Sequence, residues 1–219
     1  MSQDLIKHAP KLPALPSNLR TFMRALMRRL ARIAGSLAFI AIAIAAGATS
    51  GWYAIHIGLP FNTDRDGPWT TWTFAGTLQD DPYTRARFST LDALTVAGDR
   101  IYRFEARTDS EGRRLHSSCV YEITSAPLNA AWWSMGVFDA RGRLVENASE
   151  RFAFNHGDVA RDGRGAFSIV LSRDARPGNW LPTGAAGRMV VLFEAVEPDD
   201  DDINAAEGFQ MPPIRRVSC

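Results

Sequence analysis

Lysine is absent from residues 61–219, although this stretch contains 18 arginines. Without an ε-ammonium group, it can form neither a Schiff base nor the lysine contact of a P-loop. Its 23 acidic residues outnumber the arginines and leave a charge of −5, whereas residues 1–60 hold seven basic residues and one acid. Nucleic-acid binding requires a basic domain or stripe. The larger region has the opposite sign, and we therefore expect no nucleic-acid partner.

Histidine is also scarce, because only His116 and His156 lie in this stretch, 40 residues apart. Neither has HExxH or HxH spacing, and no GxSxG sequence is present to expose a nucleophilic serine. A catalytic triad is defined by geometry and stays open at this stage. Asp80 and Asp81 are the best local pair of acids for glycoside hydrolysis, but Asp81 before Pro82 is better explained as a helix cap. We therefore assign no catalytic residue, no metal ligand and no cofactor.

One long stretch, Ile33–Ile55, has no charged residue in 23 positions. As a helix it would be about 34 Å long, enough to cross a bilayer core of about 30 Å. A cluster of arginines precedes it: Arg20, Arg24, Arg28, Arg29 and Arg32. Because positive flanks stay on the cytoplasmic side, the sequence predicts a cytoplasmic N-terminus and a C-terminal region, after about Leu59, outside the cytoplasm.

A cleaved signal peptide is the alternative, since Ala43-Ile44-Ala45 and Ala46-Gly47-Ala48 loosely fit small-x-small cleavage sites. The apolar region of a signal peptide has about 7–15 residues, whereas this run continues past both sites. Trp52 and Tyr53 also lie where an aromatic belt would hold a spanning helix. We interpret residues 33–55 as an uncleaved transmembrane signal anchor.

Two further segments are predicted before the span. Residues 1–16 contain three prolines and no hydrophobic period, which is typical of a disordered cytoplasmic tail. Residues 17–32 predict a basic amphipathic juxtamembrane helix on the inner leaflet or, alternatively, a cytoplasmic extension of the span. Within the span, Ala43, Gly47 and Gly51 recur every four residues. This spacing allows close helix–helix contact and makes a homo-oligomer a candidate, although a segment rich in alanine and glycine also produces it by chance.

The two cysteines, Cys119 and Cys219, both follow the predicted span. An oxidising compartment favours their pairing. A bridge would close a loop of about 100 residues, worth up to about 4.7 kcal/mol in the chain-entropy model. We predict this disulfide; the alternative is a buried thiol at Cys119 and a free thiol at Cys219. Neither has a CxxC partner or a nearby histidine, which argues against a metal or redox site.

Residues 60–219 mostly show the period of two that is typical of strands. Asp81-Pro82 predicts the start of a short helix that continues to about Val96. One predicted hairpin joins 101–108 to 115–124, and a second joins 131–139 to 143–146. Further strands are expected at 69–74, 151–154, 166–171 and 188–196. Seven or more short strands predict a single antiparallel sandwich or barrel with one short helix.

Aromatic residues give the only candidate ligand site. Trp180, after Gly178-Asn179, is predicted to lie in a loop, where an indole platform beside an amide suits sugars and other amphipathic ligands. Trp132 and Trp133 point to opposite faces of their strand, so one of them can be exposed. The candidate ligand contacts are Tyr83, Arg85, Trp133, Asn179 and Trp180. The alternative is that Trp180 plugs the end of the sandwich and Asn179 closes a turn.

Several motifs occur in a recognisable order: Gly67-Pro-Trp69, Trp72, Gly76, Asp80-Asp-Pro-Tyr-Thr-Arg-Ala86, Ala106-Arg-Thr-Asp109, Cys119-x-Tyr121, Trp132-Trp-Ser134, Asn179-Trp-Leu-Pro182, Pro212-Pro-Ile214 and Cys219. Over roughly Gly58–Cys219 the chain resembles the bacterial domain-of-unknown-function 1214 family. The resemblance implies a jelly-roll-like β-sandwich in a small bacterial inner-membrane protein, with the sandwich in the periplasm, and it brings no established reaction. The family places Arg and Tyr before Pro after the last strand, whereas this chain has Phe193–Pro198, so no charge-based contact is assigned to Glu194.

Three functions follow from these observations. The first is a non-catalytic envelope protein whose β-sandwich binds a glycan or a protein partner. The second is an enzyme that acts on envelope carbohydrate or lipid through Asp80, Asp81 and Glu105. The third is a structural subunit of a membrane assembly, held together through the face of the span that carries Gly47 and Gly51.

Overall fold

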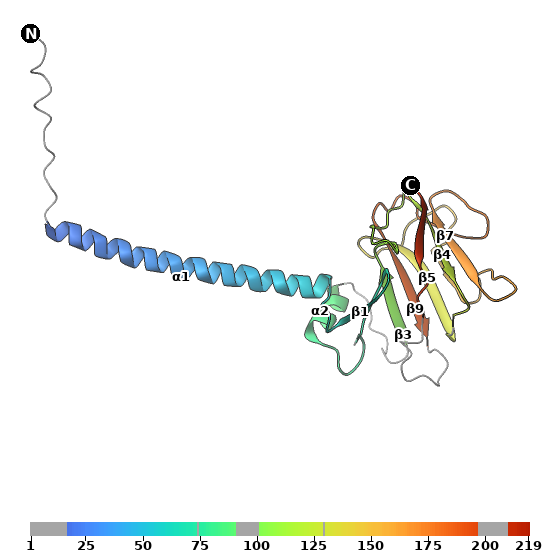
Figure 1. Cartoon of the computed structure of the whole chain (residues 1–219), viewed down its shortest axis with the longest axis horizontal. Coiled ribbons are helices and arrows are strands. Elements are labelled where there is room, and N and C mark those ends of the chain that lie inside the picture. Colours follow the sequence, from blue (N-terminus) through green and yellow to red (C-terminus); the bar gives the residue numbers. More distant parts are fainter. Residues whose placement is uncertain (1–16, 74, 91–100, 129, 197–209) are drawn as a thin grey trace, which may run out of the picture. The chain divides into compact units, whose positions relative to one another are not determined.

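The computed structural model describes residues 17–73, 75–90, 101–128, 130–196 and 210–219. Its chain forms two compact units, Met1–Trp52 and Tyr53–Cys219. The first unit, as far as it is described, is helical and belongs to α1, Ser17–His56, whose last turn lies in the second unit (Figure 1). By length and composition, Thr21–His56 can cross a membrane, and an 18-residue window within it has a mean hydropathy of 1.9. The predicted segments 17–32 and 33–55 are therefore parts of one continuous helix.

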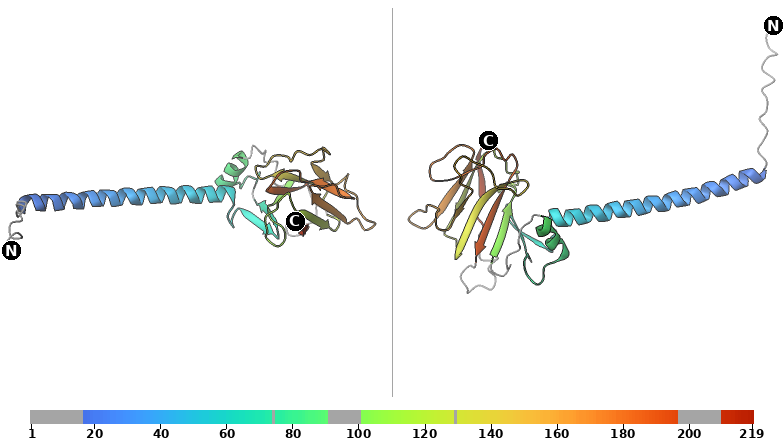
Figure 2. Two further views of the ribbon diagram at one scale, coloured as in Figure 1. Left: turned by 90° about the horizontal axis from the view of Figure 1, so that it is seen from above. Right: turned by 180° about the vertical axis from the view of Figure 1, so that it is seen from behind.

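The second unit contains a six-stranded and a four-stranded sheet (Figure 2). The larger sheet has the order β1-β2-β3-β9-β5-β6, and all of its pairs are antiparallel. Its strands are β1 Thr63–Asp66, β2 Trp69–Trp72, β3 Ile101–Ala106, β9 Met189–Val196, β5 Trp132–Asp139 and β6 Ala153–Asn155. The smaller sheet has the order β10-β4-β7-β8. Its strands are β10 Ile214–Ser218, β4 Val120–Ser125, β7 Phe167–Ser172 and β8 Asn179–Pro182.

The hydrophobic core draws on both sheets, because alternate side chains of each strand point inward. In β4 the residues Tyr121 and Ile123 are fully buried. Trp133 of β5 is fully buried as well, and it stacks on Phe167 of β7 and on Phe193 of β9, with ring centroids 4.8 and 5.9 Å away. These contacts join the two sheets, so the predicted mainly β, two-sheet fold is confirmed. One pair departs from the antiparallel prediction, since β7 and β8 are parallel.

Both predicted hairpins are wrong. The turn at 109–112 forms, with an isolated bridge between Thr108 and Arg114, but β3 and β4 then belong to different sheets. Around the second turn only Phe138 and Leu144 form a bridge, and β5 pairs with β6 and β9 instead. Alternation along a strand predicts which face is buried, but it does not specify the neighbouring strand.

The short helix is α2, Pro82–Thr90, and it begins at the predicted Asp81-Pro82 signal. The amide groups of Tyr83 and Thr84 donate to Asp81 Oδ1 at 2.9 and 3.2 Å, which is the arrangement of an N-cap. The predicted continuation of the helix to Val96 lies outside the described residues. Three strands were not expected from the sequence, namely β1, β8 and β10, and β8 replaces the loop predicted at Asn179 and Trp180.

The C-terminal strand β10 is attached to the sandwich in several ways. Cys219 forms a disulfide with Cys119, the pairing predicted from the sequence. Ile214 is fully buried and pairs with Ile123 of β4. Just before β10, the Pro212 carbonyl accepts a 2.7 Å hydrogen bond from the buried Trp69 indole. The end of the chain thus contacts both sheets.

Candidate functional site

Buried polar residues gather beside the last turn of α1, outside the main core. We call this region the junction and define it as residues 53–63, 72, 80–90 and 105. It includes the last turn of α1, the turn that follows it, all of α2, and one residue each from β1, β2 and β3. All of these residues belong to the second compact unit. Within the junction, the ring of Tyr83, a candidate ligand residue of α2, contacts that of Phe61.

Arg87 of α2 connects three elements at the junction. Its side chain is 6% exposed, and its Nη2 lies 3.3 Å from Glu105 Oε2 on β3. Its Nη1 donates to the His56 carbonyl in the last turn of α1 at 3.4 Å, and its guanidinium lies 5.8 Å from the Trp72 ring centroid on β2. A cation at this position is favourable for the unpaired carbonyl groups of a helix C-terminus. Burial lowers the pKa of Arg87 and the Glu105 carboxylate opposes that change, so the residue stays charged.

The turn after α1 is built from specific contacts. Gly58 has a φ of +83°, and a Cβ added there would lie 2.2 Å from Thr63 Cγ2. The fully buried Asn62 accepts a 2.8 Å hydrogen bond from the Leu59 amide through its side-chain oxygen. Its carbonyl accepts another from the Thr73 amide at 3.1 Å. The chain therefore passes from α1 into β1 through a defined turn.

Asp80 and Asp81 differ in their surroundings, although they are neighbours. Burial by itself raises the pKa of Asp81, but hydrogen bonds from Thr84 and Tyr83 outweigh it and hold this pKa below its ordinary value. Burial raises the pKa of Asp80, and the neighbouring Asp81 carboxylate adds to that effect. Asp81 therefore acts as a helix cap. Glu105 is occupied as well, since it lies 3.0 Å from Arg107 in addition to Arg87.

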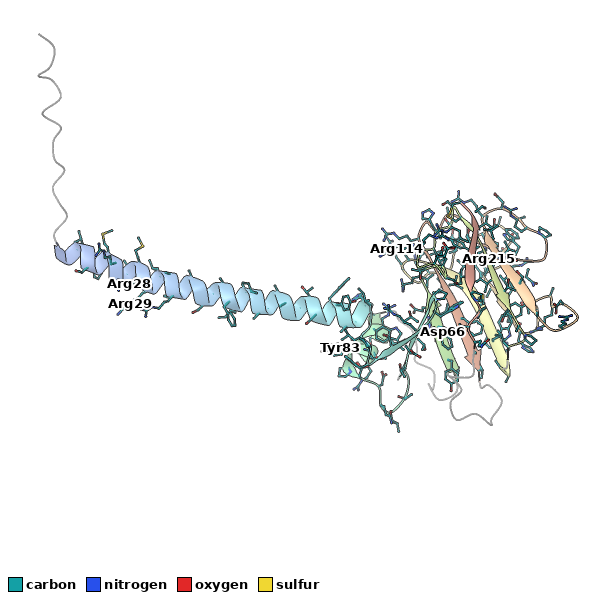
Figure 3. All side chains as sticks on the ribbon, viewed as in Figure 1. Arg28, Arg29, Asp66, Tyr83, Arg114 and Arg215 are labelled. Atoms are coloured by element: carbon teal, nitrogen blue, oxygen red, sulfur yellow. A yellow bond between two sulfur atoms is a disulfide. The ribbon has the colours of Figure 1, made fainter. Side chains whose placement is uncertain are left out.

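The candidate ligand residues are not brought together. Tyr83 and Arg85 lie exposed on α2, where the Tyr83 ring meets that of Phe61 at 6.4 Å (Figure 3). Asn179 and Trp180 lie on β8, at an edge of the smaller sheet. Asn179 is buried and exchanges 2.8 Å hydrogen bonds with the backbone of Ala160.

Both tryptophans that were proposed as ligand contacts have structural roles. The Trp180 indole donates to the Ser172 carbonyl at 3.0 Å, so its polar group is satisfied within the fold. Trp133, a candidate ligand contact, is fully buried in the core, whereas Trp132 is 42% exposed. A sequence signal for this choice existed, because Trp133, Met135 and Val137 form one alternating apolar face.

A second polar cluster lies beside β10. Asp109 is 1% exposed, and its Oδ2 lies 3.0 Å from Arg113 Nε and 3.1 Å from Arg216 Nε. The guanidinium of Arg216 also lies 5.5 Å from the Tyr121 ring centroid. Burial raises the pKa of Asp109, but the amide and guanidinium of Arg113 outweigh it and hold this pKa below the ordinary value. The neighbouring Arg114 and Arg215 lie at the surface, away from Tyr83 (Figure 3).

Metal binding has no assembled site in the part of the chain that the structure describes. There, no three residues of the types His, Cys, Asp and Glu are grouped to hold a metal ion. His116 Nδ1 lies 2.8 Å from Ser118 Oγ, and His156 Nδ1 lies 3.4 Å from Arg161 Nη2. At the junction, Arg87 holds α1, β2 and β3 against α2, and α2 exposes the side chains of Tyr83 and Arg85. Nothing in the sequence indicates that Arg87 and Glu105 form a pair, because the two residues are 18 positions apart.

Comparisons with known proteins found a family match over the β-rich region. A family described as "Protein of unknown function (DUF1214)" matches residues 100–200. The VPA0106 protein from Vibrio parahaemolyticus has a similar fold, with a TM-score of 0.52 and 24% identity over 66% of this chain and 38% of that one.

A second solved structure, an uncharacterised protein from Burkholderia cenocepacia, has a TM-score of 0.41 and 15% identity over 77% of this chain and 39% of that one. This chain thus spans well under half of either structure. No curated protein matches it. Residues 100–200, just under half of this chain, are thus similar to the family described as a protein of unknown function, DUF1214.

Proposed function

We propose that the protein is a single-pass protein of the bacterial inner membrane, with its N-terminus in the cytoplasm and its β-sandwich in the periplasm. The observation that carries this proposal is α1, whose apolar residues are exposed along its length. Five arginines precede its uncharged part and favour a cytoplasmic N-terminus. The disulfide between Cys119 and Cys219 supports an oxidising compartment for the sandwich.

The sandwich acts as a non-catalytic module that binds an envelope glycan or a protein partner. Of the three acids considered for catalysis, Asp81 caps α2 and Glu105 is paired with Arg87. Asp80 has a raised pKa, but a carboxylate mechanism requires a second acid across the substrate. The described geometry therefore gives the enzymatic alternative less support than binding.

A reporter fused after Cys219 tests the topology. Alkaline phosphatase should be active in this position, and green fluorescent protein exported by the same route should stay dark. The opposite pattern would contradict both the periplasmic location and the assignment of α1 as the anchor. A matched pair of fusions after Lys11 should give the reverse result.

Binding is tested with the full chain, purified in detergent and applied to glycan arrays, and by cross-linking in intact envelopes. Amine-reactive reagents cannot label the sandwich, since residues 61–219 contain no lysine. A photoreactive amino acid at the exposed Arg85 or Trp132 avoids this problem. If no glycan on the arrays binds the protein and neither cross-linking position gives a product, the proposed binding function is contradicted.

A further inference from the structure

Exposed apolar side chains are concentrated beside the junction. Among the described residues of the second unit, nine large hydrophobic side chains are exposed, and five of them lie between residues 53 and 83. They are Tyr53, Ile57, Phe61, Leu78 and Tyr83, with exposed fractions of 46%, 40%, 56%, 107% and 40%. Single exposed hydrophobic residues are ordinary, but a concentration of them marks an interaction surface.

The position of this group along the chain indicates what it contacts. Tyr53 is in the last turn of α1, and Ile57 directly follows the helix. The uncharged run is about 34 Å long as a helix against a bilayer core of about 30 Å, so Tyr53 and Ile57 fall at the boundary between lipid and water. Tyrosine is favoured at this depth.

Phe61 cannot lie far from the same boundary. It lies five positions after His56 along the chain, which limits the distance to about 18 Å even for an extended chain. The chain is not extended, because Leu59 accepts hydrogen bonds from the amides of Asn62 and Thr63 at 3.0 Å each. The ring contact of 6.4 Å then brings Tyr83 of α2 to the same level as Phe61.

Leu78 belongs to the loop between β2 and α2. This loop is attached to the same turn, since the Thr73 amide donates to the Asn62 carbonyl. Its other end is the Asp81 cap of α2. A leucine that projects fully from a short loop adds apolar surface without any packing inside the fold.

We propose that Phe61, Leu78 and Tyr83 form a lipid-contacting surface that inserts into the headgroup region of the membrane crossed by α1. This inference rests on the proposed membrane anchoring. The bilayer is preferred over a protein occupant because the exposed Tyr53 and Ile57, at the end of the apolar helix, precede Phe61 by only a few residues along the chain.

The test uses the full chain with single cysteine labels. The described native cysteines are both in the disulfide, so Leu78→Cys introduces a unique thiol for an environment-sensitive dye. Leu144→Cys is the matched control, because Leu144 is also an exposed leucine, at 53%. It follows β5, three strands from β2 and at the opposite end of the sheet. Ile44→Cys reports on the span itself.

The labelled proteins are reconstituted without other proteins in vesicles of phosphatidylcholine and phosphatidylglycerol that carry a nitroxide at a shallow acyl position. The dye at position 78 should be blue-shifted and quenched by the nitroxide, and the dye at 144 should show neither effect. If the dye at position 44 is quenched and the dye at position 78 behaves like the dye at position 144, the proposed lipid-contacting surface is wrong, whereas the proposed anchor is still supported. If 44 is not quenched either, both proposals fall.

Discussion

The buried ion pair at the junction can be broken from either side, by Glu105→Gln or by Arg87→Met. The two single variants are expected to lower the free energy of unfolding by unequal amounts. After Glu105→Gln, the guanidinium of Arg87 keeps only the His56 carbonyl and the Trp72 ring, in a site where it is 6% exposed. After Arg87→Met, the Glu105 carboxylate still has Arg107 at 3.0 Å. The first change therefore leaves the more isolated charge.

The magnitudes follow from this difference. Breaking a buried ion pair on one side destabilises a protein by about 3–5 kcal/mol, and Glu105→Gln should fall in this range. Arg87→Met should cost less, about 1–3 kcal/mol, because the remaining carboxylate keeps a charge-assisted partner. The double variant leaves no unpaired guanidinium and should resemble Arg87→Met, which gives a coupling free energy of about 3–5 kcal/mol in magnitude.

Urea denaturation of the full chain in detergent, followed by tryptophan fluorescence, measures these free energies of unfolding. The order of the variants should be the same at low and high salt, since buried charges are weakly screened. Arg103→Met is a suitable control, because the pair of Arg103 with Glu194 is about a third exposed and should contribute at most about 1 kcal/mol. Two outcomes would refute the conclusion that Arg87 is buried and needs the Glu105 carboxylate. One is that the losses in free energy of unfolding of the two single variants add up in the double variant. The other is a larger loss for Arg87→Met than for Glu105→Gln.

Three further predictions concern other parts of the second unit. Cys219→Ser opens the disulfide to Cys119 and should lower the free energy of unfolding by about 2–5 kcal/mol, measured by urea denaturation; an unchanged midpoint would contradict a stabilising bridge. Asp109 has a lowered pKa in the fold, so it contributes stability above its unfolded pKa of about 3.9 that is lost as the pH falls through the folded value. Asp109→Asn should therefore reduce the loss of stability between about pH 5 and pH 2, and a slope equal to that of the wild type would count against the contacts of Asp109 with Arg113. Asp81→Ala removes the cap of α2 and should cost about 1 kcal/mol, with Asp81→Asn largely neutral; equal losses in both would exclude capping as the cause.

Features that depend on neighbouring residues could be predicted from the sequence. The Asp81-Pro82 signal placed the start of α2, because a cap uses amides two and three residues away. Ile33–Ile55 identified the apolar part of α1 by composition alone. The disulfide could be predicted because the sequence has only two cysteines.

Features that depend on distant residues could not be predicted in the same way. Residues 101–108 and 115–124 read as a hairpin, yet their partners are β9 and β7. Asn179 and Trp180 read as a loop because Gly178 and Pro182 flank them, whereas parallel pairing with β7 makes them a strand. Arg87 looks like an ordinary helical arginine until β3 brings Glu105 beside it.

The disulfide has a practical consequence for protease experiments on this chain. It turns residues 119–219 into a covalent ring that includes seven of the ten strands. A single cut inside this ring leaves both pieces attached, so a nicked molecule migrates as intact on a non-reducing gel. Digestion patterns compared with and without a thiol reductant would therefore separate cleavage inside the ring from cleavage in the preceding residues.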